Sequence, residues 1–209
     1  MSERDVIDPE VSAYAEAHTT AVPQFMRRLA EDTHATLPVP EMLTGTVEGR
    51  FLEMLVFASG ARRVLELGTY SGYSALSMAA ALPSDGRIIS CEFSDTHANF
   101  AQRHIDASPY ADRIEIRRGA AIERISELEG EFDLIFVDAD KPAYLDYYEA
   151  CLPLLAERGL MVFDNTLWSR RVIEGNDDGS EQTRVLRELN DRLAQDKRVI
   201  CVQLPIRDG

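Results

Sequence analysis

The pattern of apolar and polar positions changes once along the chain, near residue 60. Before that point apolar residues recur at helical spacing, which predicts one helix over roughly Ser12–Glu31, broken near Pro23, and another over Thr46–Gly60. A proline-containing loop at 37–40 separates them. Beyond residue 60, short apolar runs alternate with amphipathic stretches, which indicates strands alternating with helices.

The second part of the chain predicts six strands and the helices that connect them. The predicted strands are Arg63–Leu67, Arg87–Glu92, Ile114–Arg117, Phe132–Val137, Leu160–Phe163 and Val199–Leu204; the predicted helices are Tyr73–Leu82, Asp95–Ala107, Ala120–Leu128, Ala143–Leu155 and Glu181–Gln195. Such alternation implies right-handed crossovers and a mainly parallel sheet with helices on both faces. We therefore predict an α/β fold in one domain over residues 1–209, made of a helical extension (1–60) and a core (61–209).

Composition narrows the classes of partner. The net charge of −14 argues against nucleic acid and against an anionic membrane surface, because both select an excess of Lys and Arg. Residues 1–10 are polar and acidic and show no signal peptide, and no apolar stretch is long enough to span a bilayer. The three cysteines are widely spaced, which predicts free thiols in a reducing compartment. We expect a cytoplasmic protein.

The loop after the first predicted strand has the features of a nucleoside-cofactor site. Gly68 allows a sharp turn and a close approach of a ligand, but the G-x-G-x-x-G spacing that holds a dinucleotide pyrophosphate is absent. Glu66 would repel a phosphate and suits a ligand with a cationic amine, and Glu92 follows the next strand, where a carboxylate can bind ribose hydroxyls. Both features fit S-adenosylmethionine. The alternatives are an ordinary strand–helix turn for the loop and simple helix capping for Ser74.

Three oxygen-bearing side chains follow two neighbouring strands at the same edge of the predicted sheet. Asp138 follows the most apolar strand, and Asp164 and Asn165 follow the next one. Neighbouring parallel strands are about 5 Å apart, so these side chains can converge on one point. Oxygen ligands without His or Cys suit a hard cation, with Mg²⁺ as the first choice and Ca²⁺ or Mn²⁺ as alternatives. The competing interpretation is that these acids cap the following helices.

Lys141 and Trp168 lie close to the predicted cation site in sequence. A phenol has a pKa near 10 and is a poor nucleophile while protonated, and a divalent cation lowers that pKa. Lys141 is placed to take the proton, so that a phenolate can attack a sulfonium methyl group in line. Trp168 could stack on an aromatic substrate. The alternatives are a solvated surface lysine and a tryptophan that only packs in the core.

Taken together, these motifs resemble the metal-dependent O-methyltransferases of the caffeoyl-CoA and catechol type, and the bacterial small-molecule branch most of all. The resemblance extends over nearly the whole chain. It rests on Val64–Ser74, on Asp138-Ala139-Asp140-Lys141 with Tyr144 and Tyr148, on Asp164–Trp168, on Met42 and Glu48–Leu52, and on Leu204-Pro205. It implies a Rossmann-like methyltransferase sheet and a homodimer that methylates a hydroxyl of a small aromatic molecule.

The resemblance also assigns roles to individual residues. It implies Lys141 and Asp138 as catalytic residues, Asp138, Asp164 and Asn165 as metal ligands, Met42, Lys141 and Trp168 as substrate residues, and Thr44, Glu66, Gly68, Thr69, Ser74, Glu92, Ala121 and Asp138 as cofactor-binding residues. Thr44 matches the residue that closes over the methionine end of the cofactor, and Met42 a wall near the methyl group.

The sequence departs from the family pattern in two places. Arg170-Arg171 stand where a glycine-containing segment is common, which indicates either selection of an anionic substrate or a solvated surface. The chain stops at Gly209, where family members continue into a last antiparallel strand that fits between the fifth and sixth strands. We therefore expect either a natural protein longer than this chain or a sixth strand that shifts to pair with the fifth.

Two other functions compete with the O-methyltransferase prediction. A nicotinamide-dependent oxidoreductase would use a similar sheet, but the missing G-x-G-x-x-G counts against it. A non-catalytic cofactor-binding homologue would keep the fold, but it would not need the acid–lysine group. The pattern does not identify the methyl acceptor.

Overall fold

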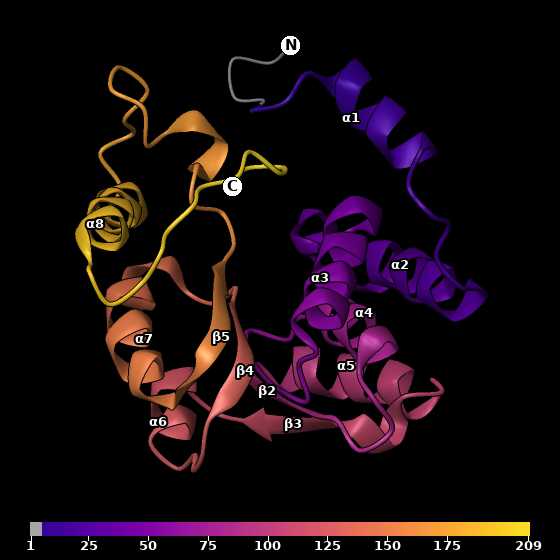
Figure 1. Cartoon of the computed structure of the whole chain (residues 1–209). Helices are drawn as coiled ribbons and strands as arrows, with labels where there is room; N and C mark the ends of the chain where they lie inside the picture. Colours follow the sequence, from indigo (N-terminus) through magenta and orange to yellow (C-terminus); the bar gives the residue numbers. More distant parts are fainter. Residues whose placement is uncertain (1–5) are drawn as a thin grey trace.

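Five parallel strands form the sheet in the computed structural model, which describes residues 6–209 (Figure 1). The strands are β1 (Arg63–Leu67), β2 (Arg87–Glu92), β3 (Ile114–Arg118), β4 (Phe132–Val137) and β5 (Leu155–Phe163). Their order across the sheet is β3-β2-β1-β4-β5, so the chain reverses direction of winding between β1 and β4. The predicted α/β fold with a parallel sheet is confirmed, and the reversal point is where such sheets bind ligands.

The helices cover both faces of this sheet, as expected for parallel strands (Figure 1). The α-helices are α1 (Pro9–Ala17), α2 (Gln24–Thr36), α3 (Thr46–Ser59), α4 (Tyr73–Ala81), α5 (Asp95–Asp106), α6 (Ala121–Ile125), α7 (Tyr144–Cys151) and α8 (Glu181–Gln195). Short 3₁₀ turns are η1 (Pro40–Met42), η2 (Ala111–Arg113), η3 (Lys141–Ala143), η4 (Leu152–Leu154) and η5 (Trp168–Arg170). No helix of the described chain is both long and apolar enough to cross a membrane.

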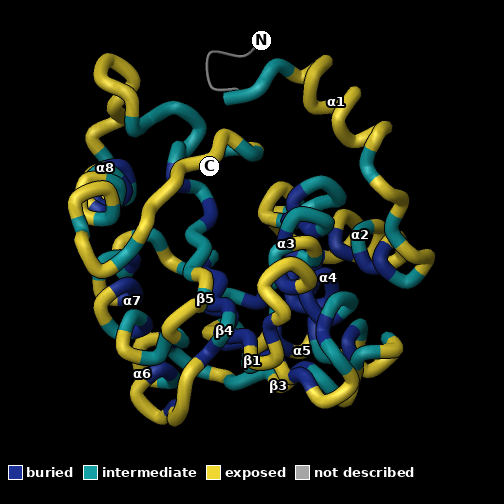
Figure 2. Tube along the Cα trace, viewed as in Figure 1, coloured by how far each residue is buried: buried dark blue, intermediate teal, exposed yellow. Residues whose placement is uncertain are grey.

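Alternating residues of the central strands bury two separate apolar faces. Val64 and Leu134 pack in a cluster with α2, α3, α4 and α5, whereas Leu65 and Ile135 pack in a cluster with α6, α7 and α8. All four side chains are fully buried. Figure 2 shows the buried residues concentrated in the sheet and the helices against it, with α1 and the C-terminal segment mostly exposed. The central strands are therefore apolar on both sides, which explains their uninterrupted apolar runs.

The N-terminal prediction is confirmed in outline, with a different end. The predicted break near Pro23 separates α1 from α2, and α2 continues to Thr36, beyond the predicted end at Glu31. None of the residues of α1 is buried, whereas Met26, Leu29 and Thr33 of α2 are. The first five residues of the polar N-terminal segment lie outside the described residues.

The predicted sixth strand, Val199–Leu204, is wrong. The segment has no regular secondary structure and forms no ladder with β5 or with any other described strand, so the expected shift toward the fifth strand does not occur. Ile200 is fully exposed and Val202 is 74% exposed. β-branched residues favour extended backbone, but a strand also needs a partner about 5 Å away, and the segment pairs with no strand among residues 6–209.

Candidate active site

The strands β1, β4 and β5 are neighbours in the sheet, so the residues that follow their carboxyl ends lie side by side. The Asp138 amide donates to Leu67 O at 2.8 Å, and the Asp164 amide donates to Val137 O at 3.0 Å. Gly68 donates to Cys91 O of β2 at 2.9 Å. These backbone hydrogen bonds bring the predicted cofactor loop and the predicted cation residues to the same edge of the sheet.

Gly68 lets these two halves approach each other. Its φ is +95°, a conformation that residues with a side chain rarely adopt. A Cβ atom at this position would lie 2.0 Å from the carbonyl oxygen of Asp138. The glycine is therefore required by this backbone contact within the protein.

Glu92 holds the cofactor loop through its carboxylate. Oε2 accepts the amides of Thr69 at 3.1 Å and Tyr70 at 2.8 Å, and Oε1 accepts the amide of Ser94 at 2.8 Å. Tyr70 has a φ of +48°, which the hydrogen bond from its amide helps to fix. A buried carboxylate with three backbone donors is well satisfied, and its remaining lone pairs are at the strand end where ribose hydroxyls were predicted to bind.

Glu66 lies beneath the loop and is not an open carboxylate. It is completely buried and accepts hydrogen bonds from Ser74 Oγ at 2.5 Å and from Ser90 Oγ. Burial raises the pKa of Glu66 to about 8, against the effect of the two hydroxyls. Thr69 Oγ1 lies 2.5 Å from Ser90 Oγ and extends this network. Glu66 thus organises Ser74 and the loop from below, whereas the sequence suggested direct contact with an amine.

The other half of the site carries an acid–lysine pair and a buried acid. Lys141 Nζ donates to Asp138 Oδ1 at 2.8 Å and to Ala139 O at 3.1 Å. Asp164 is buried, and its Oδ1 accepts the amide of Asn165 at 2.6 Å. Burial, with the charges of Asp138 and Glu48 nearby, raises the pKa of Asp164 well above its usual range. A positive charge at this point would relieve both effects.

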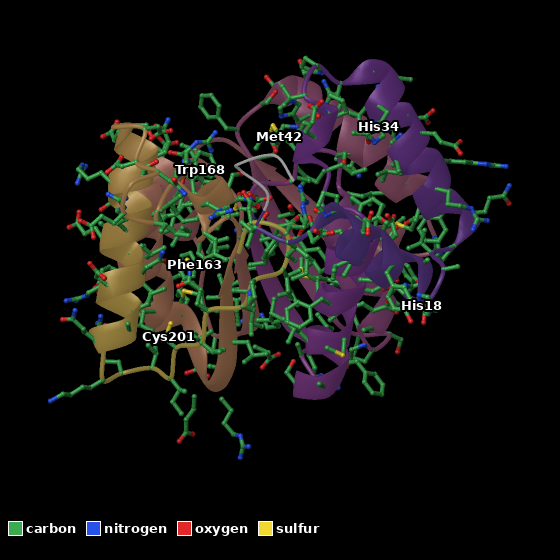
Figure 3. All side chains as sticks on the ribbon, turned by 90° about the horizontal axis from the view of Figure 1, so that it is seen from above. His18, His34, Met42, Phe163, Trp168 and Cys201 are labelled. Carbon is green, nitrogen blue, oxygen red and sulfur yellow. The ribbon has the colours of Figure 1, made fainter. Side chains whose placement is uncertain are left out.

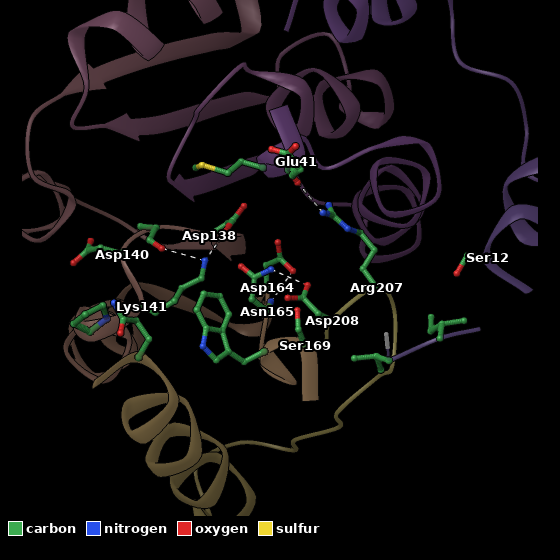
Figure 4. A pocket seen from close by; sticks show the side chains of 17 residues that line it. Ser12, Glu41, Asp138, Asp140, Lys141, Asp164, Asn165, Ser169, Arg207 and Asp208 are labelled. Atoms are coloured by element: carbon green, nitrogen blue, oxygen red, sulfur yellow. Dashed lines mark hydrogen bonds and ion pairs between the residues drawn. The ribbon is translucent and has the colours of Figure 1, made fainter. Parts of the chain in front are cut away.

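Asn165 is oriented by a residue from the far end of the chain. Its Nδ2 donates to Asp208 Oδ1 at 2.9 Å, and Figure 4 shows this pair beside Asp164. The amide oxygen of Asn165 is therefore the end left for a ligand. Among residues 6–209, no three His, Cys, Asp or Glu side chains are arranged to hold a metal ion, so the predicted set depends on this amide oxygen. Two carboxylates and an amide oxygen fit a hard cation chemically.

A cavity of about 730 Å³ opens over this half of the site (Figure 4). Its walls include six of the predicted residues: Met42, Asp138, Lys141, Asp164, Asn165 and Trp168. Met42 is half-exposed at the edge of η1, and Figure 3 shows it on a different element from Trp168. The remaining predicted residues do not line this cavity: Thr44, Glu66, Gly68, Thr69, Ser74, Glu92 and Ala121 are buried or lie in the loops of the β1–β2–β3 half.

Several cavity residues were missed by the sequence prediction. Asp140 lines the cavity and accepts a hydrogen bond from Tyr147 at 2.5 Å. Its position two residues after Asp138 was the sequence signal that could have identified it. Glu41, Arg207 and Asp208 also line the cavity. They come from segments without a periodic pattern, and nothing in the local sequence indicates that they meet.

Trp168 lies in a turn of unusual backbone. Trp168, Ser169 and Arg170 have φ values of +46°, +47° and +67°. The indole Nε1 is buried and has no hydrogen-bond partner among the described residues. The guanidinium of Arg171 lies 5.3 Å from the indole centroid and pairs with Asp178 at 3.1 Å. Neither Arg170 nor Arg171 lines the cavity.

Comparison with known proteins identifies the class that this fold and site define. The structure of an S-adenosylhomocysteine-bound methyltransferase, PaMTH1 from Podospora anserina, superposes with a TM-score of 0.88 at 28% identity, over 96% of this chain and 91% of that one. The O-methyltransferase TomG from Streptomyces achromogenes, solved with S-adenosylmethionine, gives a TM-score of 0.83 at 27% identity, over 90% and 85% of the two chains. The fold is that of S-adenosylmethionine-dependent methyltransferases.

The family is shown at the sequence level. An O-methyltransferase family model matches residues 13–209. Caffeoyl-CoA O-methyltransferase 1 from Zea mays is 38% identical over 198 residues, which cover 90% of this chain and 76% of that protein. The chain belongs to this O-methyltransferase family and is an S-adenosylmethionine-dependent O-methyltransferase of the caffeoyl-CoA type. The nicotinamide-dependent and non-catalytic alternatives are set aside.

Proposed function

We propose that the protein methylates one hydroxyl of a small aromatic diol or phenol with the help of a divalent cation held by Asp138, Asp164 and Asn165. The observation that carries this proposal is the alignment of these residues at neighbouring strand ends inside one cavity, with Lys141 Nζ 2.8 Å from Asp138. Mg²⁺ is the cation that we expect first, because all three donors are oxygens.

Each residue of the site has a separate proposed role. A bound divalent cation would supply positive charge that lowers the pKa of the acceptor hydroxyl. Lys141 Nζ then accepts the hydroxyl proton, and Asp138 keeps the lysine at the site. Trp168 and Met42 line the cavity and orient the aromatic ring of the substrate. In the other half we assign the cofactor to the loop of Gly68, Thr69 and Ser74, with Glu92 toward the ribose and Ala121 and Thr44 at its flanks.

The charges of the cavity bear on the acceptor. Its lining contains Glu41, Asp138, Asp140, Asp164 and Asp208 against Lys141 and Arg207. The two arginines that could have attracted an anion, Arg170 and Arg171, lie outside the lining. We therefore propose an acceptor without phosphate groups, in contrast to the coenzyme A ester in the name of the maize relative.

Methyl transfer from labelled S-adenosylmethionine tests these points directly. The panel contains catechol, a monophenol, caffeate and caffeoyl-CoA, each assayed with Mg²⁺ and with excess chelator. We expect turnover of the diols with Mg²⁺, loss with chelator, and recovery when Mg²⁺ is restored. Full activity in chelator removes the cation from the mechanism, and a preference for caffeoyl-CoA over caffeate contradicts the proposed acceptor class.

We also propose a homodimer located in the cytoplasm. Large apolar side chains on the outer surface of the N-terminal helices support an interface there: Tyr14 is 66% exposed and Phe57 is 78% exposed. Light scattering behind a sizing column measures the mass. A Phe57→Glu variant should shift the mass toward that of one chain if this surface is the interface.

A further inference from the structure

Arg207 joins two parts of the molecule that are far apart in sequence. Its Nη1 donates to Leu43 O at 3.0 Å, to Thr44 O at 2.8 Å and to Glu48 Oε2 at 3.0 Å, and Nη2 donates to Glu41 O at 3.2 Å. One guanidinium therefore binds three backbone carbonyls and a carboxylate of the stretch 41–48. The planar fork of arginine suits this kind of multiple contact, and lysine has no equivalent.

The residues that follow Arg207 are bound to the opposite wall of the cavity. Asp208 O accepts the amides of Leu167 at 2.7 Å and Trp168 at 3.0 Å, and Gly209 O accepts the amide of Thr166 at 2.9 Å. The segment 207–209 thus spans the cavity from the N-terminal wall to the turn that carries Trp168. Figure 4 shows the Arg207 side chain directed toward Glu41 and Asp208 directed toward Asn165.

The ion pair at the centre of this contact is shielded from solvent on one side. The Glu48 side chain is 9% exposed and that of Arg207 is 37% exposed. Burial raises the pKa of Glu48 to about 7, although Arg207 acts in the opposite direction. Removing the arginine would leave Glu48 buried without its counter-charge and free three carbonyls at once, so the stretch 41–48 would lose four hydrogen bonds to the segment 207–209.

We infer that Arg207 is a positioning residue that holds the segment Glu41–Thr44 against the cavity and so keeps the cofactor enclosed. The inference rests on the proposed places of Thr44 beside the cofactor and of Met42 in the cavity wall, and it assigns to Arg207 no contact with the reacting atoms. A purely structural role would predict lower stability without a selective effect on cofactor affinity or on the segment 41–48.

Two variants and a control separate these roles. Arg207→Ala removes all four hydrogen bonds. Arg207→Lys keeps a charge near Glu48 but cannot reach three carbonyls together. Arg184→Ala is the control, because Arg184 is exposed and its one side-chain partner in the described part of the chain is Glu188 on α8. For each protein, calorimetry measures the Kd of S-adenosylhomocysteine, hydrogen exchange follows the amides of 42–48, and thermal unfolding gives Tm. Kinetics with the best acceptor add kcat and KM.

We expect Arg207→Ala to weaken S-adenosylhomocysteine binding about tenfold and to raise the KM of the cofactor similarly, with a smaller change in kcat. Amide exchange should accelerate in 42–48 and stay unchanged in β1 and β4. Arg207→Lys should give a smaller change in the same direction, and Arg184→Ala should match the wild type. If Arg207→Ala fails to fold, the lysine variant carries the test.

Three results would overturn the inference. They are an unchanged Kd in a folded Arg207 variant, unchanged exchange in 42–48, and an acceleration of exchange spread evenly over the whole protein. The proposed function fails separately: a wild-type protein that methylates no phenol still allows the binding and exchange measurements. A selective effect on those measurements then supports Arg207 in its positioning role without the acceptor assignment.

Discussion

Two buried carboxylates at the same edge of the sheet have very different surroundings. Glu92, 7% exposed, accepts three backbone amides, whereas the carboxylate of Asp164, 8% exposed, accepts among residues 6–209 only the amide of the residue that follows it. The first is satisfied by the protein and orders the cofactor loop. The second lies near Asp138 and Glu48, and its pKa is raised well above the usual range. The contrast shows that backbone amides satisfy the acid in one half of the site, whereas the acid in the other half is buried beside two further carboxylates.

The strongest test of this contrast is Asp164→Ala. We expect methyl transfer to fall on the order of a thousandfold, because the proposed cation loses a ligand that the protein does not replace. The Kd for S-adenosylhomocysteine should change less than about threefold, because the substitution leaves the proposed cofactor-binding residues of the β1–β2 half unchanged. Asp191→Ala, an exposed position on α8, is the matched control. An equal loss of cofactor binding in Asp164→Ala would show that the two halves are not separable.

The next test introduces a steric clash between the two halves of the site, at Gly68. In Gly68→Ala the new Cβ would lie 2.0 Å from Asp138 O, at a residue whose φ is +95°. Strain and displacement of Asp138 together should lower the free energy of unfolding by about 3 kcal/mol. Urea denaturation measures this change. Gly175→Ala is the control for positive φ alone, because its Cβ would meet nothing within 4 Å. Similar losses at both glycines would mean that the contact with Asp138 contributes nothing.

The dependence of stability on pH tests the half of the site that contains Glu66. Its pKa is raised to about 8 by burial, so between about pH 4.5 and pH 8 the unfolded chain gives up a proton that the folded chain keeps. The protonated carboxyl therefore contributes full stability below pH 4.5, and this contribution is lost as the pH rises to about 8. Over that range the wild type should lose a few kcal/mol relative to Glu66→Gln, which stays neutral.

Urea denaturation of both proteins at pH 5, 6, 7 and 8 gives the difference directly. The comparison with Glu66→Gln cancels the other groups that titrate in this range, because the glutamine keeps the same size and can still bond Ser74 and Ser90. A difference that does not vary with pH would mean that Glu66 is already ionised when buried, with a pKa that burial has not raised.

The sequence predicts those features that depend on a strand or on the residues that directly follow it. β1, β2 and β4 agree with their predicted bounds because they are central strands buried on both faces. Asp138 and Asp164 could be placed together because parallel strand ends lie side by side. The failures have a common cause. Val199–Leu204 has strand-forming residues but no partner, and Arg207 meets Glu48 across 159 positions. The orientation of Glu66 toward two serines depends on side-chain packing, which spacing alone does not encode.

The smallest effect is expected at Trp168, in the wall of the cavity. In Trp168→Phe the buried indole N–H disappears, and that group has no protein acceptor among residues 6–209, so its removal offsets part of the lost packing. The free energy of unfolding should change by less than about 1 kcal/mol, and the acceptor KM should rise only a few-fold, since a phenyl ring can still stack. Trp168→Ala removes the stacking surface and should raise KM further. A Phe variant as impaired as the Ala variant would mean that the indole N–H donates to the acceptor, and Trp168 would then bind the substrate through a hydrogen bond as well as by stacking.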